Sequence, residues 1–198
     1  MYTLLKPILV REELLTKGVG IFTLQDFQRI FHTTESRTKY FLEEYTRGGL
    51  FLRLKKGLYM LGTDPLPEEE IANRLYRPSY LSFEYAMATY SLLPEMPYSV
   101  TSATTKPTRT FAVGEKTFSY FTINREAFAG YVPVKRAGRT VLMAEPEKAL
   151  VDYLYFVSTG ERPKNDRLNL ASLDRQKVLH YVRLYQRTGL DQLLKDIL

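Results

Sequence analysis

The chain of 198 residues carries 28 Lys and Arg against 22 Asp and Glu, a net charge of +6, and its length suits one medium domain or two small ones. A hydrophobic content of 44%, with 15 Tyr and 11 Phe, excludes extended disorder, and no run approaches the roughly 18 apolar residues of a membrane span. The lack of cysteine excludes disulfides, thiolate metal sites and a cysteine nucleophile, and two histidines are too few for a histidine-based metal cluster.

Three helices are expected within the first fifty residues. The segment "LLKPILVREELLTKG" has apolar residues at close to helical spacing and ends at Gly18. "FTLQDFQRIFH" follows with Thr23 as the N-cap. The third segment, "HTTESRTKYFLEEYTRGG", offers Thr33 or Thr34 as its cap and stops at two glycines.

The third predicted helix has two different faces. Helical periodicity places four residues on an inward face: Thr38, Phe41, Leu42 and Tyr45. It places five others on the outward face: Ser36, Arg37, Lys39, Tyr40 and Glu43. The inward face accounts for packing, so the polar outward face needs a separate explanation.

A basic hairpin is predicted next. In "LRLKKGLYML" two short apolar runs flank a Lys-Lys-Gly corner, and Gly57 supplies the positive φ that a tight turn needs. Three helices followed by a hairpin is the order of a winged helix-turn-helix, so we expect such a domain over residues 1–62.

The two prolines of "GTDPLPEEE" indicate a boundary between Gly62 and Pro67, followed by a second domain over residues 63–198. The acidic run Glu68–Glu70 fits a helix start, where it complements the helix dipole. Helical segments, then five β-branched and aromatic runs, then further helices to the end of the chain predict an α+β fold with a mostly antiparallel sheet.

DNA binding is the first function that this pattern suggests. Polar side chains near the start of a recognition helix read base edges in the major groove, while nearby cations hold phosphates. The candidate DNA-binding residues are Ser36, Arg37, Lys39 and Tyr40 of the third helix and Arg53, Lys55 and Lys56 of the hairpin. Residues 1–62 hold ten Lys and Arg against six Asp and Glu, which is most of the excess charge. The alternative interpretation is a solvated helix face and a basic surface turn.

Catalysis is not favoured by the spacing of the candidate residues. A nuclease centre would need carboxylates near a lysine, as in the set Glu84, Glu145, Glu147, Lys148 and Asp152. However, "AEPEKALVDYL" lacks a Glu-x-Lys core, and the glutamates at its helix start are explained by the dipole. No phosphate-binding glycine loop is present, and no local signature links Ser79, Ser82, Asp152 and His180 as a triad. We therefore expect a protein that is not an enzyme and needs no cofactor or metal.

Three stretches carry a resemblance to a known family: "KKGLYML", "PEEEIANRLYRPSYLSFEYAMATYSLLPEMP" and "FAGYVPV" with "VLMAEPEKALVDYLYF". Over roughly residues 5–160 the chain resembles the AbiEi-family antitoxins of type IV toxin-antitoxin systems, which act in abortive infection and phage resistance. The resemblance implies a winged helix-turn-helix that binds inverted repeats in its own promoter and represses its operon, and a C-terminal antitoxin domain. It also implies a nucleotidyltransferase-like toxin as functional partner, without a stable complex.

The sequence thus predicts a cytoplasmic transcriptional repressor whose partner is double-stranded promoter DNA, bound by two copies through dimerisation or cooperativity. The competing hypothesis is a protein-interaction module that neutralises a toxin by direct binding, without sequence-specific DNA recognition. We expect no membrane association.

Overall fold

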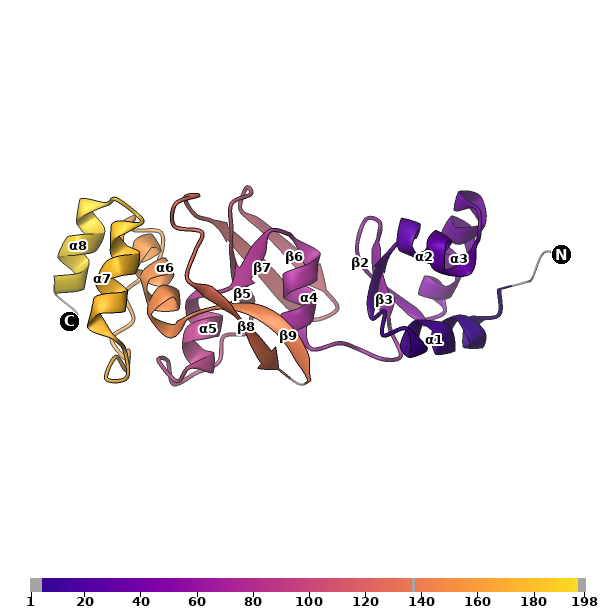
Figure 1. Ribbon diagram of the computed structural model, residues 1–198, viewed down its shortest axis with the longest axis horizontal. Coiled ribbons are helices and arrows are strands. Elements are labelled where there is room, and N and C mark those ends of the chain that lie inside the picture. The colour runs from indigo at the N-terminus through magenta and orange to yellow at the C-terminus, as the bar shows by residue number, and fades with distance from the viewer. Residues whose placement is uncertain (1–4, 137, 196–198) are drawn as a thin grey trace. The chain divides into compact units, whose positions relative to one another are not determined.

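The computed structural model describes residues 5–136 and 138–195 (Figure 1). The chain divides into two compact units, residues 1–67 and 68–198, so the division lies at the end of the Gly62–Pro67 segment in which a boundary was predicted. The segment before the division is tied to the first unit, because Arg11 forms a bidentate ion pair with Asp64 and Leu66 packs over Gly20. Within the described ranges, no helix combines the length and apolar character that a membrane crossing requires.

The first unit contains three helices and a small sheet: α1 (Pro7–Thr16), β1 (Ile21–Thr23), α2 (Leu24–Phe31), α3 (Glu35–Arg47), β2 (Phe51–Lys55) and β3 (Leu58–Leu61). All three predicted helices and the predicted hairpin are present. The strand order is β1-β3-β2, with every pairing antiparallel. Strand β1 was not predicted. The predicted first helix also included Leu4, which lies outside the described residues.

Local signals determine where α2 and α3 begin and end. The Thr23 side chain accepts a hydrogen bond from the Asp26 N–H at 3.1 Å, and the Asp26 carboxylate accepts from the Thr23 N–H at 3.0 Å, which is a capping box. The N-cap of α3 is Thr34, and its C-cap is Gly48. The chain then turns at Gly49, whose φ of 78° lies in the left-handed region.

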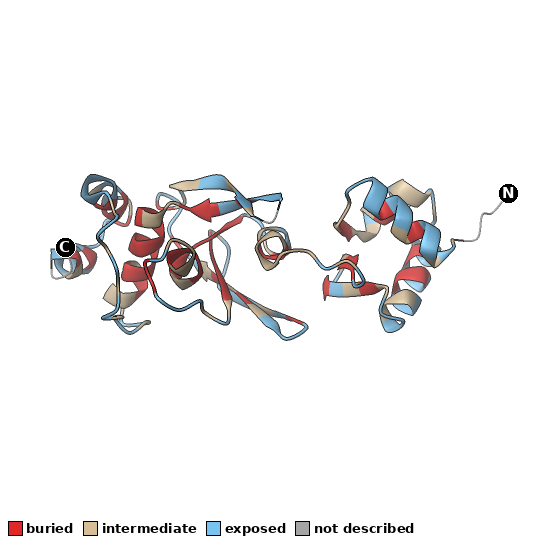
Figure 2. Ribbon diagram, turned by 90° about the horizontal axis from the view of Figure 1, so that it is seen from below, coloured by how far each residue is buried: buried red, intermediate tan, exposed pale blue. Residues whose placement is uncertain are grey.

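Aromatic side chains form the core of this unit. Phe27 of α2 is fully buried, and its ring lies 5.9 Å from Phe22, 5.7 Å from Phe41 and 6.3 Å from Phe51. These neighbours come from β1, α3 and β2, so one side chain connects four elements. In Figure 2 the exposed residues cover the outer sides of the N-terminal helices, and the buried residues face inward.

The second unit is a six-stranded mixed sheet with helices. Its elements are α4 (Glu68–Leu75), β4 (Ser79–Leu81), α5 (Phe83–Thr89), β5 (Val100–Thr104), β6 (Arg109–Val113), β7 (Lys116–Thr122), β8 (Tyr131–Arg136), β9 (Arg139–Ala144), α6 (Pro146–Ser158), α7 (Arg175–Arg183) and α8 (Thr188–Lys195). The α+β class is confirmed. The predicted final helix ran to Leu198, and residues 196–198 lie outside the described range.

The sheet order is β6-β7-β5-β4-β9-β8, and it contains more parallel pairing than expected. The pairs β4–β5, β6–β7 and β8–β9 are antiparallel, whereas β4–β9 and β5–β7 are parallel. Adjacent hairpins are visible in a sequence, but the pairing of β5 with β7 instead of β6 is a long-range choice that a local pattern does not reveal. The sheet is therefore mixed.

Helix α6 is the most deeply buried helix of this unit. It packs against α5, α7 and α8, and most of its residues from Glu147 to Phe156 are buried. Pro146 occupies its first turn, as predicted. Helix α6 thus forms the centre around which the C-terminal helices assemble.

Candidate nucleic-acid interface

The outward face of α3 is polar and cationic over its first half. Ser36, Arg37, Lys39 and Tyr40 are all exposed, and Tyr40 is the most exposed large hydrophobic residue within the described part of this unit, at 73%. The inward face is as expected, since Thr38, Phe41 and Leu42 are buried. A helical repeat of 3.6 residues separates the two sets, so the four candidate residues lie together on one side.

Ion pairs on this face are weakly held. Lys39 pairs with Glu35 one turn earlier, and both side chains are more than 60% exposed. The hydrogen bond from Lys39 lowers the pKa of the Glu35 carboxyl. Solvent-exposed ion pairs exchange readily. Lys39 is therefore available to an incoming phosphate or base edge.

The hairpin carries the second set of cations. Arg53 and Lys56 are exposed and Lys55 is half-buried, while Leu54 between them points into the core. The pairing shifts register between Arg53 and Lys55, and Gly57 has a φ of 78° at the turn. This bulge and glycine corner match the predicted tight turn and bring all three cations onto one short hairpin.

Packing joins the helix to the hairpin. The rings of Phe41 in α3 and Phe51 in β2 have centroids 6.1 Å apart, and both side chains are buried. The two cationic sets therefore belong to elements that share one core. Helical periodicity predicted the exposed α3 set, and the Lys-Lys-Gly corner predicted the hairpin set. Arg29, an exposed cation on α2 that pairs with Asp26 at 2.7 Å, was not among the candidates.

The carboxylates of the nuclease-like set form hydrogen bonds and ion pairs within the fold. Asp152 and Lys148 form a fully buried ion pair on α6. The Asp152 carboxylate also accepts hydrogen bonds from Tyr80 at 3.0 Å, Ser82 at 2.6 Å and Tyr185. Burial lowers the pKa of the Lys148 amine and raises the pKa of the Tyr80 and Tyr185 hydroxyls. Ser82 is the N-cap residue of α5, but its hydroxyl donates to Asp152 instead of capping the helix.

The remaining glutamates also have partners. Glu84 pairs with Arg162, Glu147 accepts from the Asp174 N–H at 3.1 Å, and Glu145 accepts from Tyr181 and Lys177. These contacts tie α6 to α7 and to the loop before it. His180 is exposed on α7, with its ring against Tyr181. Over residues 5–136 and 138–195, no group of three or more His, Asp or Glu side chains is placed to hold a metal ion.

No model of a known protein family matches the sequence, and no curated protein matches it either.

Proposed function

We propose that the N-terminal unit is a winged helix-turn-helix that binds double-stranded DNA in a sequence-specific manner. The observation that carries this function is the exposed, polar and cationic face of α3, which shares one aromatic core with a hairpin bearing three cations. An α-helix fits the major groove, and flanking cations hold the phosphates of the backbone. The unit thus offers both kinds of contact on a single rigid body.

Each candidate residue has a chemical role in this proposal. Arg37 and Lys39 donate to guanine O6 and N7, while Ser36 and Tyr40 contact base edges or phosphates. Arg53, Lys55 and Lys56 contact the phosphate backbone beside the groove. The phosphate contacts position the protein, and the base contacts select the sequence.

The proposed physiological role is that of an antitoxin that represses its own operon. It is supported by the resemblance to the AbiEi family in "KKGLYML" and in the segments around α4, α5 and α6. Two copies would occupy an inverted repeat and exclude RNA polymerase from the promoter. The toxin partner would be nucleotidyltransferase-like and would be opposed without a stable complex. Sequencing the adjacent reading frame tests this role, since a nucleotidyltransferase-like neighbour would support it and an unrelated one would count against it.

Fluorescence anisotropy with labelled DNA from upstream of the coding sequence tests DNA binding directly. Replacing Lys55 and Lys56 together with Ala weakens binding to every duplex and reduces the slope of log affinity against log salt by up to about two. The matched control replaces Lys135 and Lys164, two exposed lysines of the C-terminal unit, and leaves the slope unchanged. An unchanged slope in the hairpin variant removes the hairpin from the interface.

A second candidate function, direct binding of a protein partner, is favoured by one observation. Three apolar side chains of α1 are exposed: Ile8 by 65%, Leu9 by 54% and Leu15 by 44%. Ile8 and Leu15 lie seven residues apart and so share a helix face. This candidate is supported if the protein copurifies with the neighbouring gene product and the Ile8→Ser, Leu15→Ser double variant does not. DNA binding is supported if that double variant still forms the DNA complex.

A further inference from the structure

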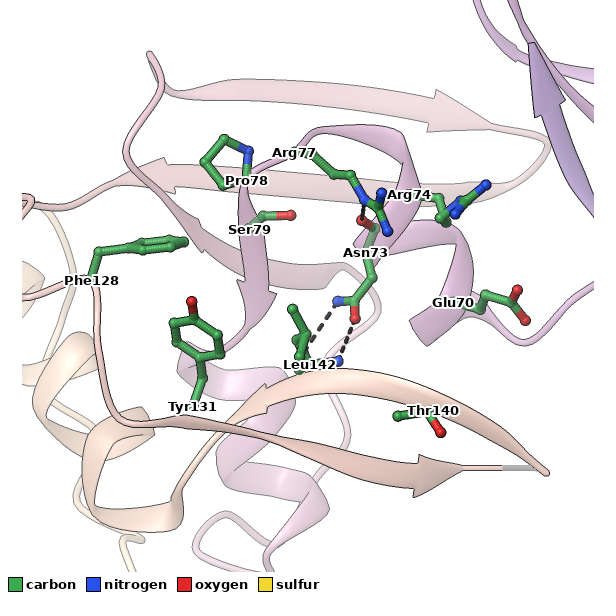
Figure 3. A pocket seen from close by; sticks show the side chains of 10 residues that line it. All are labelled: Glu70, Asn73, Arg74, Arg77, Pro78, Ser79, Phe128, Tyr131, Thr140 and Leu142. Carbon is green, nitrogen blue, oxygen red and sulfur yellow. Dashed lines mark hydrogen bonds between the residues drawn. The ribbon is translucent and has the colours of Figure 1, made fainter. Parts of the chain in front are cut away.

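A pocket of about 550 Å³ opens in the C-terminal unit between α4, β4 and the β8–β9 hairpin (Figure 3). This volume lies within the roughly 300–1,000 Å³ typical of sites for small organic ligands. Arginine, aromatic and small polar side chains line it. All of them belong to the C-terminal unit, so a ligand here does not depend on DNA binding by α3 and the hairpin.

The pocket exists because β4 and β9 separate from each other. These parallel strands pair where Leu81 lies opposite Met143. Before that point the Asn73 side-chain amide donates to the Leu142 carbonyl at 3.2 Å and accepts from the Leu142 N–H. Asn73 thus satisfies the strand edge and holds the opening in place.

Ser79 provides a polar atom that is suited to a ligand. Its side chain is 5% exposed, and its Oγ has no hydrogen-bond partner within the described part of the chain. Figure 3 shows the hydroxyl pointing toward the side of the pocket formed by Asn73 and Arg77. A buried hydroxyl without a partner destabilises the folded state. An acceptor oxygen of a bound ligand would remove that deficit.

The charged part of the pocket favours an anion. Arg74 and Arg77 line it, and Nε of Arg77 donates to the Asn73 main-chain carbonyl at 3.3 Å, which positions the guanidinium. Glu70, the carboxylate of the lining, forms an ion pair with Arg139, with Oε2 and Nε 3.4 Å apart. Counting Arg139, three arginines stand against the single carboxylate of Glu70 around this pocket, so these charged side chains carry net positive charge. Guanidinium groups match the oxygens of a phosphate in geometry.

The aromatic part lies on the side away from Arg74 (Figure 3). Phe128 and Tyr131 line the pocket there, with ring centroids 5.4 Å apart. Tyr131 stacks on the fully buried Tyr80 at 4.6 Å with an interplanar angle of 17°, and Tyr80 is itself held by Asp152. The buried network of α6 therefore fixes the aromatic wall. A fixed aromatic surface suits a planar ring system.

We propose that this pocket binds a nucleoside 5′-monophosphate moiety. The base lies against Phe128 and Tyr131, the phosphate is held by Arg74 and Arg77, and the Ser79 hydroxyl donates to a ligand oxygen. Inorganic phosphate would leave the aromatic side uncovered, and a nucleoside would bring no anion to the arginine side. The complete moiety uses both sides and fits the volume.

Isothermal titration calorimetry of the full chain tests this site with AMP, GMP, CMP and UMP in turn, and with the four matching nucleosides and inorganic phosphate as comparisons. At least one monophosphate binds about tenfold more tightly than its nucleoside and than phosphate, as expected when a charge-assisted hydrogen bond is added. Absence of binding by all four monophosphates overturns the site, as does equal binding of inorganic phosphate.

A nucleoside 5′-monophosphate moiety is also present at the 5′ end of a phosphorylated nucleic-acid strand. A 5′-phosphorylated trinucleotide is therefore titrated as well. Tighter binding of the trinucleotide, if reduced by Arg77→Gln, assigns the end of a strand as the ligand. Tighter binding of the monophosphate assigns a free nucleotide. Both results support the pocket. If Arg77→Gln weakens neither the trinucleotide nor the monophosphate, the proposal is overturned.

Two variants and a control locate the binding. Arg77→Gln and Ser79→Ala each weaken binding of the monophosphate by about tenfold. The control, Arg183→Gln, changes an exposed arginine of α7 away from the pocket and leaves the affinity unchanged. Ser79→Ala also raises the melting temperature of the ligand-free chain, because it removes an unsatisfied hydroxyl. Unchanged affinity in this well-folded variant contradicts the assignment of Ser79.

Discussion

Phe41 on the inward side of α3 and Phe51 in β2 have rings 6.1 Å apart within one buried cluster. Phe51 also meets Phe22 edge-on at 5.6 Å, so the hairpin, β1 and α3 share this contact. The outward residues of α3 and the cations of the hairpin are consequently carried by elements that do not move independently. The proposed binding of DNA by two contact sets depends on this rigidity.

Phe51→Ala removes the hairpin's side of that contact. We expect a loss of about 3–5 kcal/mol in the free energy of unfolding of the N-terminal unit, because a buried phenyl ring is replaced by a cavity. Urea denaturation followed by far-ultraviolet circular dichroism measures it. Tyr40→Ala, at an exposed aromatic residue of the same unit, serves as the control and changes stability little. Equal effects of the two substitutions contradict the packing role of Phe51.

Glu35→Gln releases Lys39 from its exposed ion pair. The variant removes a negative charge from the proposed DNA face, so we expect tighter binding to duplex DNA at low salt. The gain shrinks as salt rises, since exposed charges are screened. Anisotropy titrations at three salt concentrations measure the change. Glu43→Gln, further along the same face, is the comparison, and a larger gain there places the DNA nearer the end of α3.

Much of the N-terminal unit follows from local chemistry. The N-cap at Thr23, the glycine stop after α3 and the Gly57 corner are each set by neighbouring residues, and each was predicted, whereas the reciprocal bond from the Thr23 N–H to Asp26 was not. Strand β1 has three residues, and it forms a strand because Ile21 pairs with Met60, which lies much later in the chain. A contact over that separation leaves no local pattern.

In the C-terminal unit, still more of the structure depends on contacts between residues that are far apart in the sequence. Lys148 and Asp152 are four residues apart, so their adjacency on a helix was visible, but their complete burial depends on Tyr80 and Tyr185 from other elements. The pocket is likewise formed by side chains of α4, β4 and β9 that are up to about seventy residues apart in the chain. Its clearest sign, the unpartnered Ser79 hydroxyl, exists only in the folded structure.

Asp152→Asn leaves the buried Lys148 amine without its counter-charge. We expect a loss of about 3–5 kcal/mol in stability, as for other broken buried ion pairs. Lys148→Met is less harmful, because Asp152 keeps three hydroxyl donors. Thermal and urea unfolding compare the two variants. Glu95→Gln, which breaks the exposed pair with Arg167, is the control and has little effect. A larger loss in Lys148→Met contradicts the network.

Stability should fall in alkaline solution. Burial raises the pKa of several tyrosine hydroxyls above the ordinary value of 10.0, namely those of Tyr80, Tyr85, Tyr120, Tyr181 and Tyr185. In the unfolded chain these groups lose their protons at lower pH, so their contribution is full below pH 10 and is lost as pH rises above it. The lowered pKa of Lys148 acts in the opposite direction, but it is one group against seven, because burial raises the pKa of Tyr90 and Tyr153 as well.

Urea midpoints measured between pH 8 and pH 12 test this dependence for the C-terminal unit, with tyrosinate absorbance as an independent signal. We expect an unchanged midpoint up to about pH 10 and a steep fall beyond it, together with tyrosinate absorbance appearing as the unit unfolds. Full tyrosine ionisation while the chain stays folded would show that these hydroxyls are not protected.

The most direct measurement of the central claim is the ratio of affinities for the upstream duplex and for a shuffled duplex of the same composition, in the wild type and in Arg37→Ala. If Arg37 reads a base, the variant loses about 1–3 kcal/mol of discrimination while its affinity for the shuffled duplex changes little. Equal losses on both duplexes, or equal wild-type affinities for the two, would contradict sequence reading by α3.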